Sequence, residues 1–573
     1  MHFPGFTIAC LSFIASTLAV PHGHMLVKRY MPREGDCSYK KIVRKATTGI
    51  NADEAEYIMN RQNVTVQVWK DYLERLALDN FDVTKFLEDT SKIPSVGIAI
   101  SGGGYRAMLT GGGAYKAFDN RFDESKDAKT GGIVQLADYF SGVSGGSWLT
   151  TSMASNDFAD IETLVRDVFK MPLSIFTPFD TTWENAKYYA RMAGEIAAKR
   201  WAGFPISLTD FWGRMMSKHL LADDGLHVTF SSIAETNSWK NHAIPYVISV
   251  GEGVPNGFKP SALFPTNSTI YEFTVDEMGS WDDNIGSFSS MKYLGTEVDE
   301  DGHATGKCVT GLDNAGFVTG TSSAMIGAVI FGKLNMSNIP FVGQYLSNLN
   351  MESLMDESNW KLSAFPNVFK GFNKEQNSVA EDKTINMVDG ATSGLNLPIW
   401  PLMNPNRNVD VIIAVDSSSD INDYPDGTAM VAAYNRSKVD RKNGRRMPKV
   451  PDTVTFLNNG LTTKPVFFGC NEPESVLIVY LPNSAYSFDS NINTMNTTTY
   501  SNEVTASMVQ NGFNVATMGN NKIDENWSVC LGCALIYKGI ERLGWEQTET
   551  CKSCFGRYCW VGQMNTAMAD IPV

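Results

Sequence analysis

Apolar and polar runs along the chain predict strands that are followed by helices. Residues 95–118 contain a β-branched apolar run, three successive glycines and then apolar side chains at helical spacing, a pattern typical of a strand, a tight turn and a helix. Residues 133–155 repeat this order. Apolar runs at 384–388, 409–415 and 476–481 have the length of buried strands. The pattern predicts an α/β fold with a mostly parallel central sheet flanked by helices.

The rest of the chain is predicted to pack on this sheet or to be inserted into it. Residues 52–87 have apolar side chains at helical spacing. Residues 158–221 are rich in Met, Trp, Phe and Tyr at the same spacing, which favours a helical core, with a lid over an apolar substrate as the alternative. No internal repeat or low-complexity linker interrupts the chain. We therefore expect one domain over 37–573, with a cap or insertion at 158–300.

The N-terminus has the pattern of an export signal. Residues 1–19 contain an apolar stretch followed by the small residues Thr17 and Ala19, as a signal-peptide cleavage site requires. Because the first residues carry no Lys or Arg, a buried N-terminal segment is the alternative. No later run reaches the roughly 18 to 20 apolar residues that a membrane-spanning helix needs. We expect a secreted protein, either extracellular or held in the cell wall or periplasmic space.

Cysteine usage agrees with export. Nine cysteines minus Cys10 of the predicted signal leave eight, and an even number in an exported chain favours four disulfides. Within the cysteine-rich segment 526–560, the spacing Cys530-x2-Cys533-x17-Cys551-x2-Cys554 also fits a zinc site of four thiolates. The sequence between the two pairs is helix-like, which favours disulfides, because a zinc ribbon holds its cysteines on tight turns.

Composition and charge exclude several classes of protein and partner. The 573 residues are 43% apolar and 19% charged, close to globular averages, which excludes disorder or coiled coil as a description of the whole chain. The net charge of -14 and the absence of a long Lys/Arg run argue against nucleic acid as a partner. Six Asn-x-Ser/Thr sequons permit N-glycosylation: Asn63, Asn267, Asn335, Asn435, Asn496 and Asn526.

A candidate nucleophile lies in the second strand-turn-helix unit. Residues 142–146, GVSGG, form a GxSxG motif centred on Ser144, in the context where a strained turn exposes a serine hydroxyl at a helix N-terminus. The usual α/β-hydrolase order is Ser, then Asp or Glu, then His. None of the seven histidines lies beyond residue 303, so this order fails. Four of them are interpreted as structural or surface residues: His219, His227, His242 and His303.

The remaining candidate base is Asp389. It ends the strand-like run 384–388 and precedes a glycine. A carboxylate at the C-terminal end of a strand lies on the edge where α/β sheets carry their sites, and an ordinary Asp-Gly turn is the alternative. An aspartate with the reference pKa near 4 is a poor base for an alcohol, so the site must desolvate the carboxyl and raise its pKa.

The first strand-turn-helix unit has the sequence of an oxyanion-binding loop. In residues 101–106, SGGGYR, successive glycines let backbone N–H groups converge on a developing negative charge, and the cation of Arg106 adds to it. Gly102-x-Gly104-x-x-Ala107 also matches a dinucleotide fingerprint. The polar segment 119–130 stands where that fold needs a second strand, which argues against a nucleotide-dependent oxidoreductase.

Three motifs in this order, SGGGYRAM, SGVSGGSW and MVDG, resemble the fungal lysophospholipase/phospholipase B family, which shares its catalytic domain with the mammalian cytosolic phospholipases. Segments 311–323 and 414–420 and the terminal cysteine pattern extend the resemblance over most of the chain. The resemblance implies a Ser-Asp dyad, an oxyanion hole and a cation that steadies the phosphate or the oxyanion. The residues implied are Ser144 as nucleophile, Asp389 as base, Gly103 and Gly104 as the hole, and Arg106 as the cation.

After the aspartate, the chain departs from the family pattern. The family usually has DGGEDGQNIP, whereas residues 389–398 are DGATSGLNLP, so Ala391, Thr392, Ser393 and Leu395 differ. These changes put head-group or rate properties in question. They also motivate an alternative function, a catalytically reduced homologue that binds lipid.

The resemblance and the residues predict a secreted, N-glycosylated hydrolase that cleaves fatty-acyl esters of lysophospholipids and phospholipids through an acyl-enzyme. Its partner would be lipid in micelles or at a membrane surface. This chemistry requires no cofactor and no metal ion.

Overall fold

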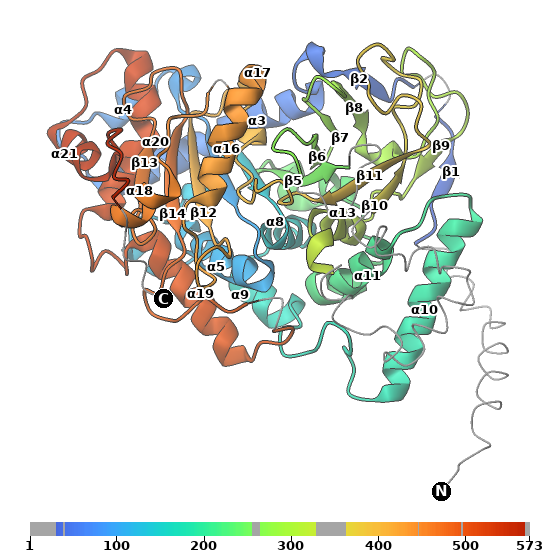
Figure 1. Cartoon of the computed structure of the whole chain (residues 1–573). Coiled ribbons are helices and arrows are strands. Elements are labelled where there is room, and N and C mark those ends of the chain that lie inside the picture. Colours follow the sequence, from blue (N-terminus) through green and yellow to red (C-terminus); the bar gives the residue numbers. More distant parts are fainter. Residues whose placement is uncertain are drawn as a thin grey trace, which may run out of the picture.

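Twelve strands form the central sheet in this computed structural model, which describes residues 30–37, 40–254, 264–327, 363–444, 446–493 and 497–567. The export signal predicted at 1–19 lies outside these residues. The sheet runs from the C-terminal strands at one end to β6, β7 and β8 near the other (Figure 1). In spatial order, its strands are β13 (Val466–Phe468), β14 (Leu477–Pro482), β12 (Val411–Asp416), β3 (Val96–Ile100), β4 (Tyr139–Gly142), β5 (Tyr246–Gly253), β6 (Ile270–Thr274), β7 (Glu277–Ser280), β8 (Ser287–Ser290) and β2 (Val43–Lys45), with β11 (Thr384–Asp389) on β5 and β10 (Ser363–Pro366) on β11. A separate pair joins β1 (Arg33–Gly35) to β9 (Cys308–Thr310).

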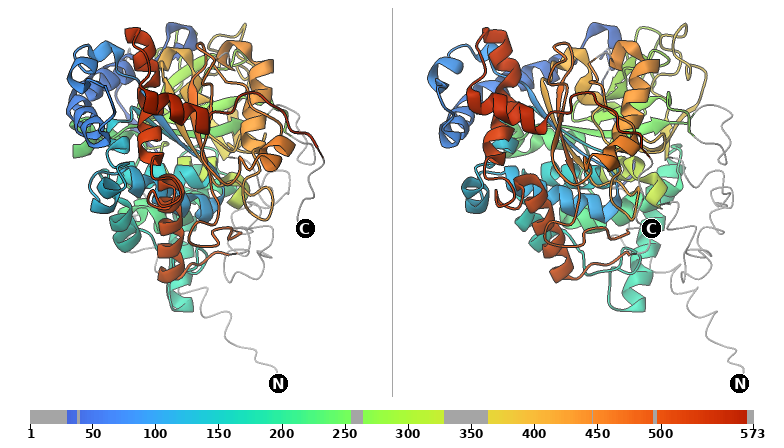
Figure 2. Two further views of the ribbon diagram at one scale, coloured as in Figure 1. Left: turned by 90° about the vertical axis from the view of Figure 1, so that its left-hand side faces the viewer. Right: turned by 60° about the vertical axis from the view of Figure 1, so that its left-hand side comes forward.

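Helices lie on both sides of this sheet, with α3 and α16 on opposite sides in Figure 2. Every residue of β3, β12 and β14 is buried, which explains their continuous apolar sequences. The helices are α3 (Ala52–Leu76), α4 (Val83–Phe86), α5 (Gly104–Phe118), α6 (Asp123–Asp127), α7 (Ile133–Leu136), α8 (Gly145–Ser155), α9 (Ile161–Thr163), α10 (Thr182–Trp201), α11 (Leu208–Leu220), α12 (Asn237–Lys240), α13 (Ala315–Ser322), α16 (Thr428–Val439), α17 (Arg441–Gly444), α18 (Thr453–Asn458), α19 (Asn502–Thr517), α20 (Trp527–Leu543) and α21 (Glu549–Tyr558).

The α/β architecture is confirmed, and its sheet is mixed. Parallel pairing joins five adjacent strands, β14, β12, β3, β4 and β5. The pairs from β5 through β6, β7 and β8 to β2 are antiparallel, as are those of β13, β10 and β11. The expectation of a mostly parallel sheet therefore holds only for its centre. The two residues between β6 and β7 are too few for the crossover that parallel neighbours need.

The range 158–300, expected to be a cap or insertion, divides into two parts. Its first part is helical and contains α9 to α12. Its second part contributes β5 to β8 to the central sheet. The segment that can be called inserted therefore ends before Tyr246, where β5 begins. Among the described residues, no helix has the length and apolar character needed to cross a membrane.

Four disulfides link the eight cysteines, as predicted. Two of them hold α20 against α21, and the other two close longer loops. The pairs are Cys37–Cys308, Cys470–Cys559, Cys530–Cys554 and Cys533–Cys551. The zinc alternative is wrong. The four cysteines that would bind the ion instead form two disulfides between α20 and α21.

Candidate active site

Ser144 lies in a strained turn between β4 and α8. Its backbone has φ 52° and ψ −119°, a region that residues with a side chain rarely adopt. Its N–H donates to Ser322 Oγ at 3.0 Å, and that hydroxyl donates to the carbonyl oxygen of Val250 at 2.7 Å. Helix α13 therefore ties the turn to β5. The strained turn between a strand and a helix that the GxSxG motif predicts, the elbow, is therefore present at Ser144.

Strand β5 brings Asp389 to this turn through long-range pairing. The first half of β5 pairs in parallel with β4, with Gly142 opposite Ser249. Its last three residues pair antiparallel with β11, with Asp389 opposite Gly251, while β6 occupies the other edge. Strands β4 and β11 therefore approach each other along one edge of β5. Their ends meet where Ser144 leaves the sheet.

The two side chains are in contact in a buried environment. Ser144 Oγ lies 3.4 Å from Asp389 Oδ2, and Asp389 Oδ1 accepts the N–H of Ala391 at 3.0 Å. Burial raises the pKa of the Asp389 carboxyl to about 7, although hydrogen bonds from the backbone of Ala391 and Met325 and from Ser144 oppose the shift. A carboxyl that titrates near neutrality can take a proton from an alcohol in a transition state and return it.

The glycine loop between β3 and α5 lies directly against the elbow. A Cβ atom on Gly102 would lie 3.1 Å from Ser144 Cβ, and one on Gly145 would lie 2.1 Å from the carbonyl oxygen of Gly104. Only glycine at 145 permits this approach. The N–H of Gly102 donates to the carbonyl oxygen of Asn396 at 3.0 Å, and Asn396 Nδ2 donates to the carbonyl oxygen of Gly102 at 3.3 Å. The structure thus brings the predicted oxyanion loop beside the predicted nucleophile.

Arg106 lies beneath this loop and joins it to two other segments. Its Nε donates to the carbonyl oxygen of Ser417 at 3.0 Å, and its Nη1 lies 3.5 Å from Asp423 Oδ1 and donates to the carbonyl oxygen of Ile492 at 3.2 Å. The residue is 1% exposed. Burial lowers its pKa and Asp423 opposes the change, so the cation is retained. A Cβ on Gly103 would lie 2.9 Å from Arg106 Nη2, which places the guanidinium against the glycine loop.

The four histidines within the described residues lie in other environments. His219 is buried in α11, and burial lowers its pKa to about 4. His242 packs against the ring of Tyr57, His303 lies 3.8 Å from Asp299, and His227 is exposed. These positions agree with their interpretation as structural or surface residues.

Three residues that hold the site were not identified from the sequence. Ser322 and Asn396 lie in the segments 311–323 and 389–398, which carry the family resemblance, but the residue types did not reveal their contacts. Glu252 accepts hydrogen bonds from the backbone and side chain of Ser393. Its signal in the sequence is a charged residue at the end of the apolar run that forms β5.

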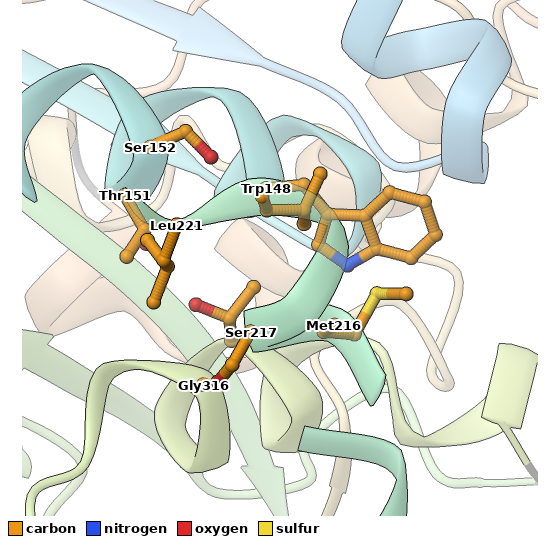
Figure 3. A pocket seen from close by; sticks show the side chains of 9 residues that line it. Trp148, Thr151, Ser152, Met216, Ser217, Leu221 and Gly316 are labelled. Atoms are coloured by element: carbon orange, nitrogen blue, oxygen red, sulfur yellow. The ribbon is translucent and has the colours of Figure 1, made fainter. Parts of the chain in front are cut away.

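Side chains of α11 and α13 pack against α8 beyond its N-terminal turn. Trp148 and Thr151 of α8 face Met216 and Ser217 of α11 and Gly316 of α13 (Figure 3), and the void between them has no room for a water molecule. In the ranges that the structure describes, no group of three or more His, Cys, Asp or Glu side chains is arranged to hold a metal ion.

Comparisons with known proteins point to one family. The family model described as the lysophospholipase catalytic domain matches residues 96–565. Lysophospholipase 2 of Aspergillus fumigatus is 37% identical over 556 residues, which cover 94% of each chain. Lysophospholipase 1 of Candida albicans is 36% identical over 552 residues, which cover 93% of this chain and 89% of the relative.

The fold also resembles a solved structure. Human GIVD cytosolic phospholipase A2 superposes with a TM-score of 0.63 and 15% sequence identity, covering 88% of this chain and 69% of that chain. At this identity, the likeness supports the fold alone.

Proposed function

The chain belongs to the lysophospholipase catalytic-domain family, whose members are carboxylic ester hydrolases, and we propose that it releases fatty acids from lysophospholipids and phospholipids through Ser144 and Asp389. The observation that carries this proposal is the contact of 3.4 Å between the serine hydroxyl and a buried carboxyl whose pKa is raised to about 7. The relatives are named lysophospholipases, which supports the substrate class.

In the first half of the reaction, Ser144 Oγ attacks the carbonyl carbon of the fatty-acyl ester. Asp389 takes the hydroxyl proton on Oδ2, and the amides of Gly103 and Gly104 stabilise the oxyanion. When the tetrahedral intermediate collapses, the ester C–O bond breaks. Asp389 then returns the proton to the leaving alkoxide, and an acyl-enzyme remains.

In the second half, water hydrolyses the acyl-enzyme. Asp389 takes a proton from the attacking water and delivers it to Ser144 Oγ when the fatty acid leaves. Arg106 steadies the oxyanion by fixing the glycine loop and the segment at Ser417. Every proton transfer then uses a side chain whose contacts are described above.

Fatty-acid release from lysophosphatidylcholine tests the proposal. We expect Ser144→Ala and Asp389→Asn each to lose activity by at least about a thousandfold. Ser147→Ala is the matched control for the serine, because Ser147 lies in the first turn of α8, the helix that follows Ser144, and its Oγ contacts Ser249 Oγ at 2.6 Å rather than Asp389. Asp313→Asn is the control for the carboxyl, because Asp313 is also buried and accepts the N–H of Ser231.

An inactive wild type that nevertheless binds lysophosphatidylcholine micelles would support the alternative of a catalytically reduced lipid-binding homologue. The replacements after Asp389 motivate that alternative. Against it, Asp389 keeps its contacts with Ser144 and Ala391 despite those replacements.

We further propose that the protein is secreted and N-glycosylated. The four disulfides support an oxidising compartment. The sequon residues Asn63, Asn267, Asn435 and Asn526 are exposed, whereas Asn335 and Asn496 lie outside the described residues. Enzymatic removal of N-glycans from the protein recovered from culture medium should lower its apparent mass, and an unchanged mass would contradict the glycosylation.

A further inference from the structure

A second buried carboxyl, that of Glu252, lies on the strand that pairs with the end of β11. Glu252 is the next residue on β5 after Gly251, which pairs with Asp389. It is opposite Val388 of β11 on one edge and Ile270 of β6 on the other, and none of its surface is exposed. Neither half of the proposed reaction uses this acid.

Glu252 holds the far end of the turn that begins with Asp389. Its Oε1 accepts the N–H of Ser393 at 3.2 Å and the hydroxyl of Ser393 at 2.8 Å. At the near end, Asp389 Oδ1 accepts the N–H of Ala391, and the carbonyl oxygen of Asp389 accepts the hydroxyl of Thr392 at 2.8 Å. The turn is therefore fixed by one carboxyl at each end.

The surroundings of Glu252 favour its neutral form. Its Oε2 is buried without a hydrogen-bond partner, and an ionised carboxylate with one oxygen unpaired in an apolar environment is strongly disfavoured. Burial, with a smaller contribution from the like charge of Asp389, raises the pKa of Glu252 to about 8, although the bonds from Ser393 and the Arg436 cation oppose this. Arg436 lies on α16 and Asp389 on β11, and β6 faces Glu252 with the apolar Ile270.

We propose that Glu252 is a positioning residue that holds the Asp389 turn as a protonated acid, and that loss of its proton ends the productive arrangement at alkaline pH. The inference rests on the proposed function, because it assigns Glu252 to the reaction of Ser144 and Asp389. During turnover Asp389 must be ionised, so an ionised Glu252 would be a second negative charge in the same buried region. At alkaline pH, Glu252 releases its proton to solvent. The turn then either shifts so that water reaches the new charge, or Asp389 stays protonated and cannot act as the base.

The pH dependence of kcat for fatty-acid release, measured on the full chain between about pH 5 and pH 9.5, tests this role. The kcat of the wild type should be highest between about pH 7 and about pH 8. It should fall at lower pH as Asp389 is protonated and at higher pH as Glu252 loses its proton. Glu252→Gln keeps the acceptor for Ser393 and cannot ionise. It should keep the acidic limb and lose the alkaline limb, with activity near pH 7 within about threefold of wild type.

Two further variants separate positioning from general stability. Glu252→Ala leaves Ser393 without its acceptor and should lower kcat by at least about tenfold with little change in KM. Ser393→Ala should lower kcat less, because the backbone N–H still donates to Glu252. Thermal unfolding, measured in parallel, identifies any variant that does not fold, and the conservative Glu252→Gln keeps the test decisive.

The outcomes are distinguishable from failure of the proposed function. If the wild type is active, Ser144→Ala is inactive and Glu252→Gln retains the wild-type alkaline limb, the role of Glu252 is wrong and the dyad stands. A wild type with no alkaline limb up to about pH 9.5 would overturn it as well. If Ser144→Ala keeps wild-type activity, the proposed function itself fails.

Discussion

The two halves of the site are built in different ways. The elbow around Ser144 combines the hydrogen bond to Ser322 with close backbone packing. Its φ is a strained 52°, and a Cβ on Gly145 would lie 2.1 Å from the carbonyl oxygen of Gly104. The turn after Asp389 is held by side-chain hydrogen bonds from Thr392 and Ser393. The elbow is therefore rigid and intolerant of change, whereas the turn can change residues and keep its shape.

This difference explains how the chain departs from the family pattern at four positions between 391 and 395 without losing the contact between Ser144 and Asp389. A hydroxyl or amide in the turn can be replaced by another hydrogen-bonding group. At position 145, by contrast, every residue other than glycine brings a Cβ for which there is no room.

Asp389→Asn should make the protein more stable at alkaline pH although it abolishes activity. The pKa of Asp389 is raised in the fold to about 7, so the folded state binds the proton more tightly than the unfolded chain. Stability is therefore greatest below the unfolded pKa near 4 and falls as the pH rises through 7, by up to about 4 kcal/mol. The asparagine variant lacks this loss, so it should be more stable than wild type at pH 8. Thermal unfolding at pH 8 and pH 4 measures the difference, which should nearly vanish at pH 4. Equal stability at pH 8 would contradict the raised pKa.

Gly145→Ala should reduce fatty-acid release by more than about a hundredfold, since the loop must move by an ångström or more and reactions are sensitive to such shifts. Gly556→Ala is the control, because a Cβ at this helical glycine meets no atom within 4 Å. A crystal structure of the Gly145 variant would show where the loop moved. Activity near that of wild type would mean that the elbow is not rigid.

Ser322→Ala removes the acceptor for the N–H of Ser144 and should lower kcat about tenfold, with a smaller change in KM. Ser323→Ala, at the next position, removes a hydroxyl that bonds to Trp212 and to the carbonyl oxygen of Thr319 instead. It serves as the control, and steady-state kinetics on both variants tests whether α13 supports the elbow specifically. Equal losses in the two variants would argue against that support.

Thr392→Ala should change activity by no more than about threefold, because Asp389 keeps its hydrogen bond from the N–H of Ala391. Steady-state kinetics near pH 7 measures this. A loss as large as that of Gly145→Ala would remove the contrast between the two halves of the site.

The sequence predicted the elbow half of the site better than the turn half. A strand, a glycine-flanked serine and a helix are consecutive in the chain, so local pattern specifies the turn at Ser144. Asp389 was assigned by its place at a strand end and by family resemblance, but the antiparallel pairing of β11 with β5 that brings it to Ser144 joins residues more than a hundred positions apart.

The remaining differences have the same origin. The sheet was expected to be mostly parallel because the motif-bearing strands alternate with helices, whereas the connections among β6, β7 and β8 were not recognised as short links between antiparallel neighbours. Four disulfides followed from the number of cysteines, but the pairing of two of them depends on how α20 lies against α21. The contacts of Glu252 and Asn396 link different segments. A charged residue at the end of an apolar run marks Glu252, but no local pattern reveals its partner Ser393.

The central claim is that Ser144 forms the acyl-enzyme. Wild-type protein mixed with lysophosphatidylcholine, quenched in acid within the first turnover and digested, can be analysed by mass spectrometry for an acylated peptide. The account predicts one fatty-acyl group on the peptide that contains Ser144, absent from Ser144→Ala and much reduced in Asp389→Asn. An active wild type with the acyl group on another residue would contradict it.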